Sequence, residues 1–184
     1  MNGEKRAHAG YYTLSGDVNS DMVRRVFEAV DRMTVDGTQT AHVLLQSNGG
    51  YVSDGICLYN MLSHAPIDLV MYNCGAVASI AVTLFLAGKH RVASDTARFM
   101  LHKSHANAPS GSRPEALKII AEGLMADDRR TETILHRHVR LPQAMWNVHA
   151  NADLHLAAPE ALDAGLVHRI GDFSPAAGCV IHHI

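Results

Sequence analysis

Strand-like and helical segments alternate along most of this chain, and this alternation restricts the possible folds more than any other feature. Short runs rich in apolar and β-branched residues predict strands at 11–14, 41–45, 67–72, 90–93, 98–101 and 166–170. Between them, apolar residues at helical spacing predict one helix from Asn19 or Ser20 to about Met33 and another ending near His64, before Pro66. Such alternation favours a parallel sheet with helices on its faces, so we expect an α/β architecture.

The second half of the chain is expected to be more helical. The apolar run 75–88 is too short to cross a bilayer and predicts a buried helix that begins near Ser79. A polar stretch with proline and glycine predicts a loop at 104–112, followed by a long helix at about 114–139. Shorter helices are expected near 144–148 and from Pro159 to Gly165.

Composition limits the class of protein. A length of 184 residues fits one domain, and the formal net charge of −2 gives no reason to expect nucleic acid or an acidic membrane as a partner. Three cysteines without a CxxC pair argue against a disulfide framework, and Cys57 and Cys74 are expected to pack as small hydrophobes. The basic start is not followed by an apolar run, so we expect no secretory signal and a cytoplasmic protein.

Three polar residues suggest chemistry. Ser79 is a lone hydroxyl in an apolar run, His102 ends a strand-like segment, and Asp153 lies in a polar stretch. A nucleophile, a base and an orienting acid are what acyl transfer needs, and the Gly49-Gly50 pair could supply a backbone donor for an oxyanion. Taken singly, each of these features has a plainer interpretation. Ser79 fits a packing serine, His102 is one of 13 histidines, Asp153 fits a solvated aspartate, and Gly49-Gly50 fits a turn.

Four separate blocks, in order, resemble the proteolytic subunit of the Clp protease (ClpP). They are Ser47-Asn48-Gly49-Gly50, Gly75-Ala76-Val77-Ala78-Ser79-Ile80-Ala81, Ala97-Arg98-Phe99-Met100-Leu101-His102 and Asp153-Leu154-His155-Leu156-Ala157-Ala158-Pro159-Glu160-Ala161. The resemblance covers about 11–172. It implies a crotonase-like spiral of βαβ units at 11–173, with the 114–139 helix as a protruding handle, between an N-terminal tail at 1–10 and a C-terminal tail at 174–184.

The resemblance also implies roles for particular residues. It makes Ser79, His102 and Asp153 a catalytic triad, with the oxyanion hole formed by the backbone N–H groups of Gly50 and Ile80. Gly49, Gly50, Lys103 and Ser104 would bind an extended peptide by strand addition. It implies no metal and no cofactor.

The chain also departs from the family pattern. Asn48 replaces a proline, Ile80-Ala81 replaces Met-Gly, and Lys103-Ser104 replaces Gln-Pro. Asn151-Ala152 replaces an acidic residue and an arginine that join two rings in the family. The final residues, 179–184, fit either docking on a neighbour or a frayed tail, and His182-His183 fits a frayed polar end better than a metal site.

The function expected from these observations is that of a serine endopeptidase acting inside a homo-oligomeric chamber. The resemblance implies a heptameric ring, perhaps doubled, and raises an ATPase unfoldase as a partner. A catalytically silent ring subunit that scaffolds an active paralogue is the alternative, and co-purification of mixed subunits would favour it. A crotonase-like acyl-CoA enzyme fits less well, because it would need acidic catalysts near the oxyanion hole, and a thioester hydration assay would test it.

Overall fold

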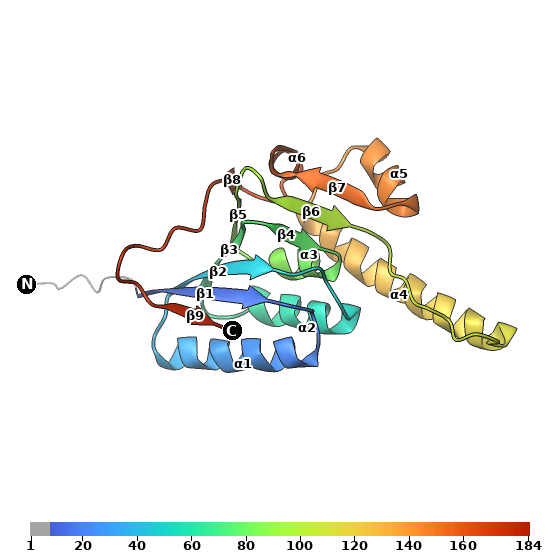
Figure 1. Cartoon of the computed structure of the whole chain (residues 1–184), viewed down its shortest axis with the longest axis horizontal. Helices are drawn as coiled ribbons and strands as arrows, with labels where there is room; N and C mark the ends of the chain where they lie inside the picture. Colours follow the sequence, from blue (N-terminus) through green and yellow to red (C-terminus); the bar gives the residue numbers. More distant parts are fainter. Residues whose placement is uncertain (1–7) are drawn as a thin grey trace, which may run out of the picture.

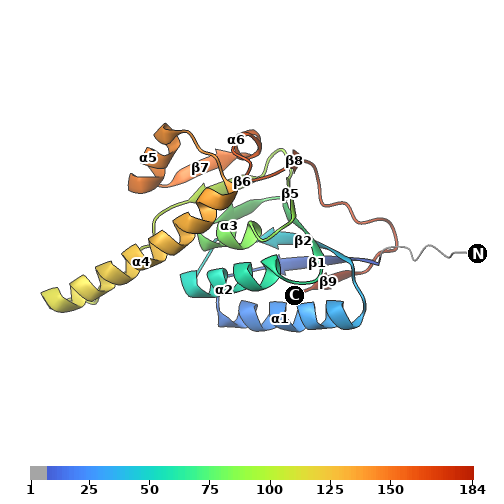
Figure 2. The same cartoon turned by 180° about the vertical axis from the view of Figure 1, so that it is seen from behind.

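A computed structural model of the protein describes residues 8–184. Strands and helices alternate along the first two thirds of this range (Figures 1 and 2). The strands are β1 (Ala9–Ser15), β2 (Thr40–Gln46), β3 (Asp68–Asn73), β4 (Ala76–Ala78), β5 (His90–Ala93), β6 (Arg98–Leu101), β7 (Leu154–Ala157), β8 (Arg169–Ile170) and β9 (Ile181–His183). The helices are α1 (Ser20–Val35), α2 (Val52–Ser63), α3 (Ile80–Phe85), α4 (Pro114–His138), α5 (Gln143–Asn151) and α6 (Ala158–Asp163).

The strands form two sheets. Six of them make one sheet in the order β8-β5-β3-β2-β1-β9, in which every neighbouring pair is parallel. The other three make a small sheet, β4-β6-β7, in which β6 and β7 are antiparallel. The expected α/β architecture with a parallel sheet is therefore confirmed.

Side chains of the large sheet divide between its two faces with a period of two residues. In β2, Ala41, Val43 and Leu45 are buried in the main core, which also contains the apolar faces of α1, α2 and α3. The opposite face carries a smaller cluster around Val70 and Tyr72, against which Phe173 packs. The helices cover the first face, as the view from behind shows (Figure 2).

Helix α1 begins where the sequence predicts. The Asn19 side chain accepts a hydrogen bond from the Met22 N–H at 3.0 Å, which satisfies one of the free donors of the first turn. Met22, Val26, Ala29 and Met33 follow at helical spacing, and all four are buried. The cap and the apolar spacing together determine where the helix starts and which face it buries.

Helix α4 is the protruding handle. Pro114 occupies the first turn, where its missing N–H costs no hydrogen bond. Of its 25 residues, only Ile134 and Leu135 are buried, and both lie in the C-terminal part. The N-terminal part extends away from the body of the protein together with the loop before it (Figure 1). Apolar side chains at Leu117 and Ile119 are exposed there.

The apolar run 75–88 is divided in two by Ser79, and the buried helix predicted to begin near this residue does begin there. The first residues of the run form strand β4, and helix α3 is only six residues long. The first segment is extended because it pairs with strand β6. The second segment is helical, and all six of its residues are buried. Within residues 8–184, no helix combines the length and the apolar character needed to cross a membrane.

Two further expectations require correction. Cys57 and Cys74, expected to pack as small hydrophobes, are both exposed. The C-terminal tail is neither frayed nor extended away from the chain, because β9 pairs in parallel with β1. The ring of His182 stacks on Tyr12, and His183 Nδ1 lies 2.6 Å from Thr13 Oγ1.

A buried cation joins the ends of two helices. Arg91 in β5 is 5% exposed, and its guanidinium donates hydrogen bonds to the carbonyls of Gly88, Gly165 and Leu166, which lie just beyond α3 and α6. No carboxylate among the described residues pairs with it, and burial lowers the pKa of Arg91 to about 10. The carbonyl oxygens at these helix ends therefore stabilise the charge.

Replacing Arg91 with methionine is expected to lower the free energy of unfolding by about 3 kcal/mol, because buried carbonyls without a donor cost roughly 1–3 kcal/mol each and relief of the buried charge offsets only part of this. Urea unfolding of the variant tests this. Arg24→Met, on the exposed face of α1, is the control, because exposed ion pairs are worth about 1 kcal/mol or less. Equal stability of the two variants would contradict the role given to Arg91.

Candidate active site

Ser79 occupies the turn between β4 and α3. Its φ is 57° and its ψ is −134°, and no other non-glycine residue in 8–184 has a positive φ. Such a conformation costs on the order of 1–3 kcal/mol and persists only where the surroundings fix it. Here the Ser79 N–H donates to the Met100 carbonyl at 2.7 Å, which ties the turn to strand β6.

His102 reaches Ser79 because of the pairing of two strands. Strand β6 lies parallel to β4 with Ala78 opposite Met100, so the chain carries His102 past the end of β4. The Nε2 atom of His102 lies 2.8 Å from Ser79 Oγ, which is hydrogen-bond distance. The predicted nucleophile and the predicted base are therefore in direct contact.

The glycine pair lies against the same turn. A Cβ on Gly49 would come within 2.6 Å of the Ser79 Cβ, and one on Gly50 would come within 2.2 Å of the Val18 carbonyl oxygen. Both positions have a positive φ, at 104° and 153°, so only glycine fits them without strain. Within residues 8–184 the Gly50 N–H donates no hydrogen bond, and the Ile80 N–H belongs to the first turn of α3, which has no intrahelical acceptor.

Asp153 is close to His102 by strand register but is not bonded to it. Strands β6 and β7 are antiparallel, and their last pair is Leu101 opposite Leu154. One further step along the ladder places His102 opposite Asp153. The Asp153 side chain is exposed, and the hydrogen bonds of residues 8–184 do not include one between it and His102. The structure therefore brings Ser79 and His102 together. Asp153 lies opposite His102 one residue pair beyond the end of the β6–β7 ladder, and it is not bonded to this histidine.

These residues line a cavity of about 470 Å³. Its lining includes Asn48, Gly50, Ser79 and His102, together with residues of α4. Ser104 also lines this cavity, whereas Lys103 does not. The lining of the cavity combines apolar and polar side chains. The apolar ones are Val52, Ile80, Val82, Leu101, Ala106, Leu124 and Leu135, and the polar ones include Thr83, Asp127 and Thr131.

Comparison with known proteins identifies the family of the chain. The model of the family described as Clp protease matches residues 8–173, which is most of the chain. The chain belongs to the Clp protease family. The fold and the family expected from the sequence are thus confirmed.

Two relatives are similar in sequence, and a solved structure is similar in fold. The chain is 28% identical over 160 residues to ATP-dependent Clp protease proteolytic subunit 3 of Rhodococcus jostii, covering 85% of this chain and 78% of that protein. It is 28% identical over 137 residues to proteolytic subunit 2 of Corynebacterium glutamicum, covering 73% and 67%. A mutant of ClpP1 from Listeria monocytogenes has the same fold, with a TM-score of 0.73 and 18% identity over 90% of this chain and 91% of that one.

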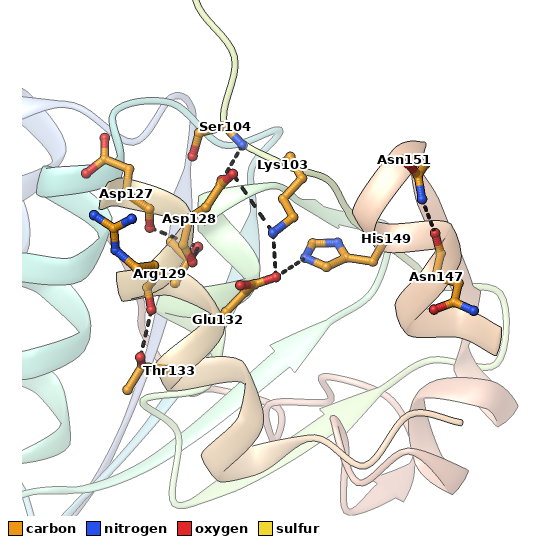
Figure 3. A network of polar contacts seen from close by, with 11 residues as sticks. Lys103, Ser104, Asp127, Asp128, Arg129, Glu132, Thr133, Asn147, His149 and Asn151 are labelled. Atoms are coloured by element: carbon orange, nitrogen blue, oxygen red, sulfur yellow. Dashed lines mark hydrogen bonds and ion pairs between the residues drawn. The ribbon is translucent and has the colours of Figure 1, made fainter. Parts of the chain in front are cut away.

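This Clp-family chain anchors the segment after His102 on helix α4. Lys103 Nζ lies 2.5 Å from Glu132 Oε1, and the Ser104 N–H donates to Asp128 Oδ1 at 2.7 Å (Figure 3). Lys103 and Ser104, expected from the sequence to bind substrate, therefore contact two acidic residues for which the sequence predicted no role, Asp128 and Glu132. Asp128 and Glu132 are four residues apart on a predicted helix, so the sequence does indicate that both lie on one face of it.

His149 in α5 is the other residue that the sequence analysis left without a role. It is 3% exposed and lines the cavity, and its Nδ1 atom is buried without a hydrogen-bond partner among the described residues. Burial, followed by the positive charge of Lys103, lowers the pKa of His149, while Glu132 opposes this shift. His149 is therefore neutral at neutral pH, because its pKa lies below the ordinary value of about 6.5.

Proposed function

We propose that this Clp-family chain is a serine endopeptidase that cleaves peptide bonds through an acyl-enzyme on Ser79. The observation that supports this most is the 2.8 Å contact between His102 Nε2 and Ser79 Oγ, two residues that line a cavity. A serine hydroxyl becomes a competent nucleophile only when a base can take its proton. The strained turn at Ser79 and the two crowded glycines add to the argument, because strain of this kind concentrates at functional sites.

The proposed reaction has two halves. In the first, the Ser79 Oγ proton passes to His102 Nε2 while Oγ bonds to the carbonyl carbon of the scissile peptide. The C–N bond then breaks, and His102 returns the proton to the leaving amine. In the second, water attacks the acyl ester with His102 again as the base, which releases the acid and restores the Ser79 hydroxyl.

Backbone N–H groups would stabilise the intermediate. The N–H groups of Gly50 and Ile80 have no acceptor of their own in this part of the fold, so both are available to the oxyanion. Asp153 would bond to the other ring nitrogen of His102 and stabilise the imidazolium. This requires the β6–β7 ladder to extend by one residue pair.

The substrate is proposed to be an extended peptide or an unfolded chain, with the protein assembled as a homo-oligomeric ring. The exposed apolar side chains of the handle support assembly, because Leu117, Ile119 and Met125 are 44%, 69% and 58% exposed. Single exposed apolar residues are common, but three on one projecting helix favour an interface. A heptameric ring, single or doubled, and an ATPase unfoldase that delivers substrates to it are parts of the same proposal.

Labelling with a fluorophosphonate tests the nucleophile directly. We expect one adduct per wild-type chain by intact mass, located on Ser79 by peptide mapping. His102→Gln should label far more slowly, because the base that activates the hydroxyl is lost. Ser63→Ala, at the end of α2, should label like the wild type. An assembled wild-type protein that takes no adduct would refute the proposal.

One observation favours a second candidate, a ring subunit without turnover of its own. Asp153 is exposed and makes no hydrogen bond to His102 within the described residues, so the predicted orienting acid is not engaged. Such a subunit would scaffold or modulate an active paralogue. It would take no fluorophosphonate alone and would co-purify with a second subunit that does.

A further inference from the structure

The segment that follows His102 is held by charge on helix α4. Lys103 Nζ lies 2.5 Å from Glu132 Oε1 and 3.9 Å from Asp128 Oδ2. The Ser104 backbone is bonded to the same Asp128. Lys103, Asp128 and Glu132 have side-chain exposures of 32%, 19% and 31%, so this contact is partly shielded from water. Two acidic residues of α4 therefore restrain the chain directly beyond the predicted base.

Glu132 also faces the segment that leads to Asp153. Its Oε1 atom lies 3.9 Å from Nε2 of the buried His149 in α5. Helix α5 ends at Asn151, so Asp153 follows the buried contact by only four residues. Figure 3 shows Glu132 between Lys103 on one side and His149 on the other. One carboxylate thus lies between the two segments that carry His102 and Asp153.

The charges in this cluster do not balance. Two carboxylates face the single ammonium of Lys103, while the nearby Arg130 is paired with Asp127 at 3.0 Å. His149 is neutral because burial and Lys103 lower its pKa. Glu132 is therefore attracted to Lys103, and its Oε1 atom faces the α5 imidazole across 3.9 Å, from which it would accept a hydrogen bond on closer approach.

We propose that Glu132 is a positioning residue that holds the ends of β6 and α5 in the register that places Asp153 opposite His102, so that the two side chains can bond in the assembled protein. The register supports this, since Leu101 and Leu154 are paired and the next pair outward is His102 and Asp153. Opposed residues in an antiparallel ladder have Cβ atoms about 5 Å apart, which a carboxylate and an imidazole can bridge. The inference rests on the proposed function, because it assigns Glu132 a part in aligning that site.

Glu132→Gln tests this inference with a readout that does not depend on hydrolysis. The Nδ1 proton of an imidazole bonded to a carboxylate can be followed by NMR in protein with ¹⁵N-labelled histidine. We expect this His102 signal in the assembled wild type and in Glu122→Gln, which removes an exposed carboxylate of the same helix. It should be absent in Asp153→Asn and absent or strongly weakened in Glu132→Gln. A wild type without the signal, or a Glu132→Gln variant that retains it unchanged, would overturn the inference.

The rate of fluorophosphonate labelling gives a second test. Glu132→Gln should slow labelling by about 10²-fold, because a displacement of about 1 Å at the reacting groups costs this much. In an Asp153→Asn background the same substitution should cost nothing further, since the contact that Glu132 serves is already lost. An equal loss of labelling rate in both backgrounds would show that Glu132 does not act through the contact between Asp153 and His102.

Lys103→Gln covers the case in which Glu132→Gln does not fold. It removes the same ion pair from the other side and should also weaken the His102 signal. A wild type that gives the signal but takes no fluorophosphonate would refute the proposed function and leave the positioning role of Glu132 supported. The proposed function and the positioning role of Glu132 can therefore be refuted independently of each other.

Discussion

Ser79→Ala is expected to lower the hydrolysis of a short fluorogenic peptide by roughly 10⁶-fold, the scale on which loss of the nucleophile removes catalysis by a triad. The residual rate would come from binding and the oxyanion donors alone. Only the hydroxyl is lost, and the Ser79 N–H that donates to Met100 remains. The unfolding curve and the native mass should therefore stay close to those of the wild type.

The control for this variant is Ser63→Ala, which lies at the end of α2 on a different part of the surface. It should hydrolyse the peptide at the wild-type rate. Turnover retained by Ser79→Ala would mean that the contact between Ser79 and His102 serves packing and that another residue carries the chemistry. Loss of both turnover and assembly would show that the substitution disturbs the strained turn.

Asp153→Asn is expected to reduce turnover by roughly 10⁴-fold, with native mass and stability unchanged. An amide has no charge to stabilise the imidazolium that forms when His102 takes the Ser79 proton, and it can hold the ring in the wrong tautomer. The Michaelis constant should change little, since Asp153 is not among the residues that line the cavity. Steady-state kinetics on the assembled protein provide the measurement.

Asp163→Asn serves as the matched control, because this exposed residue ends α6 and faces no part of the cavity. A near-normal rate for Asp153→Asn would mean that the exposed position of Asp153 in the described structure is also its working position. His102 would then be oriented by another group or by none. In that case the Ser79–His102 contact would act as a dyad.

Sequence pattern predicted the elements with clear periodicity and failed where periodicity is ambiguous. Helix α1 has a cap and four buried apolar residues at helical spacing, so its start and face could be foreseen. The run 75–88 is predominantly apolar, and such a run cannot distinguish strand from helix by periodicity. Strand β4 was missed for this reason. Strand β7 was missed because its Leu-His-Leu-Ala alternation is only four residues long.

Some residues of the candidate site could likewise be predicted from the sequence, and others could not. Ser79, His102 and Gly49-Gly50 lie in local motifs that resemble a known family, and the structure brings them together. The cluster of Lys103, Glu132 and His149 could not be foreseen, because its members are far apart in the chain and meet only through the packing of α4 and α5. Pairing between β9 and β1 was missed for the same reason, since three residues near the C-terminus carry no pattern that indicates a strand 170 residues away.

Helix α4 has a mechanical consequence that follows from its length. Leu124, Asp127, Thr131 and Leu135 of this helix contribute to the cavity wall, while the part nearer its N-terminus projects beyond the body. An unbroken helix of 25 residues is about 37 Å long and moves as a stiff rod. We therefore expect a displacement of the projecting part to be transmitted along the helix to the cavity wall. A partner that binds this part would change the width of the cavity without contacting any residue inside it.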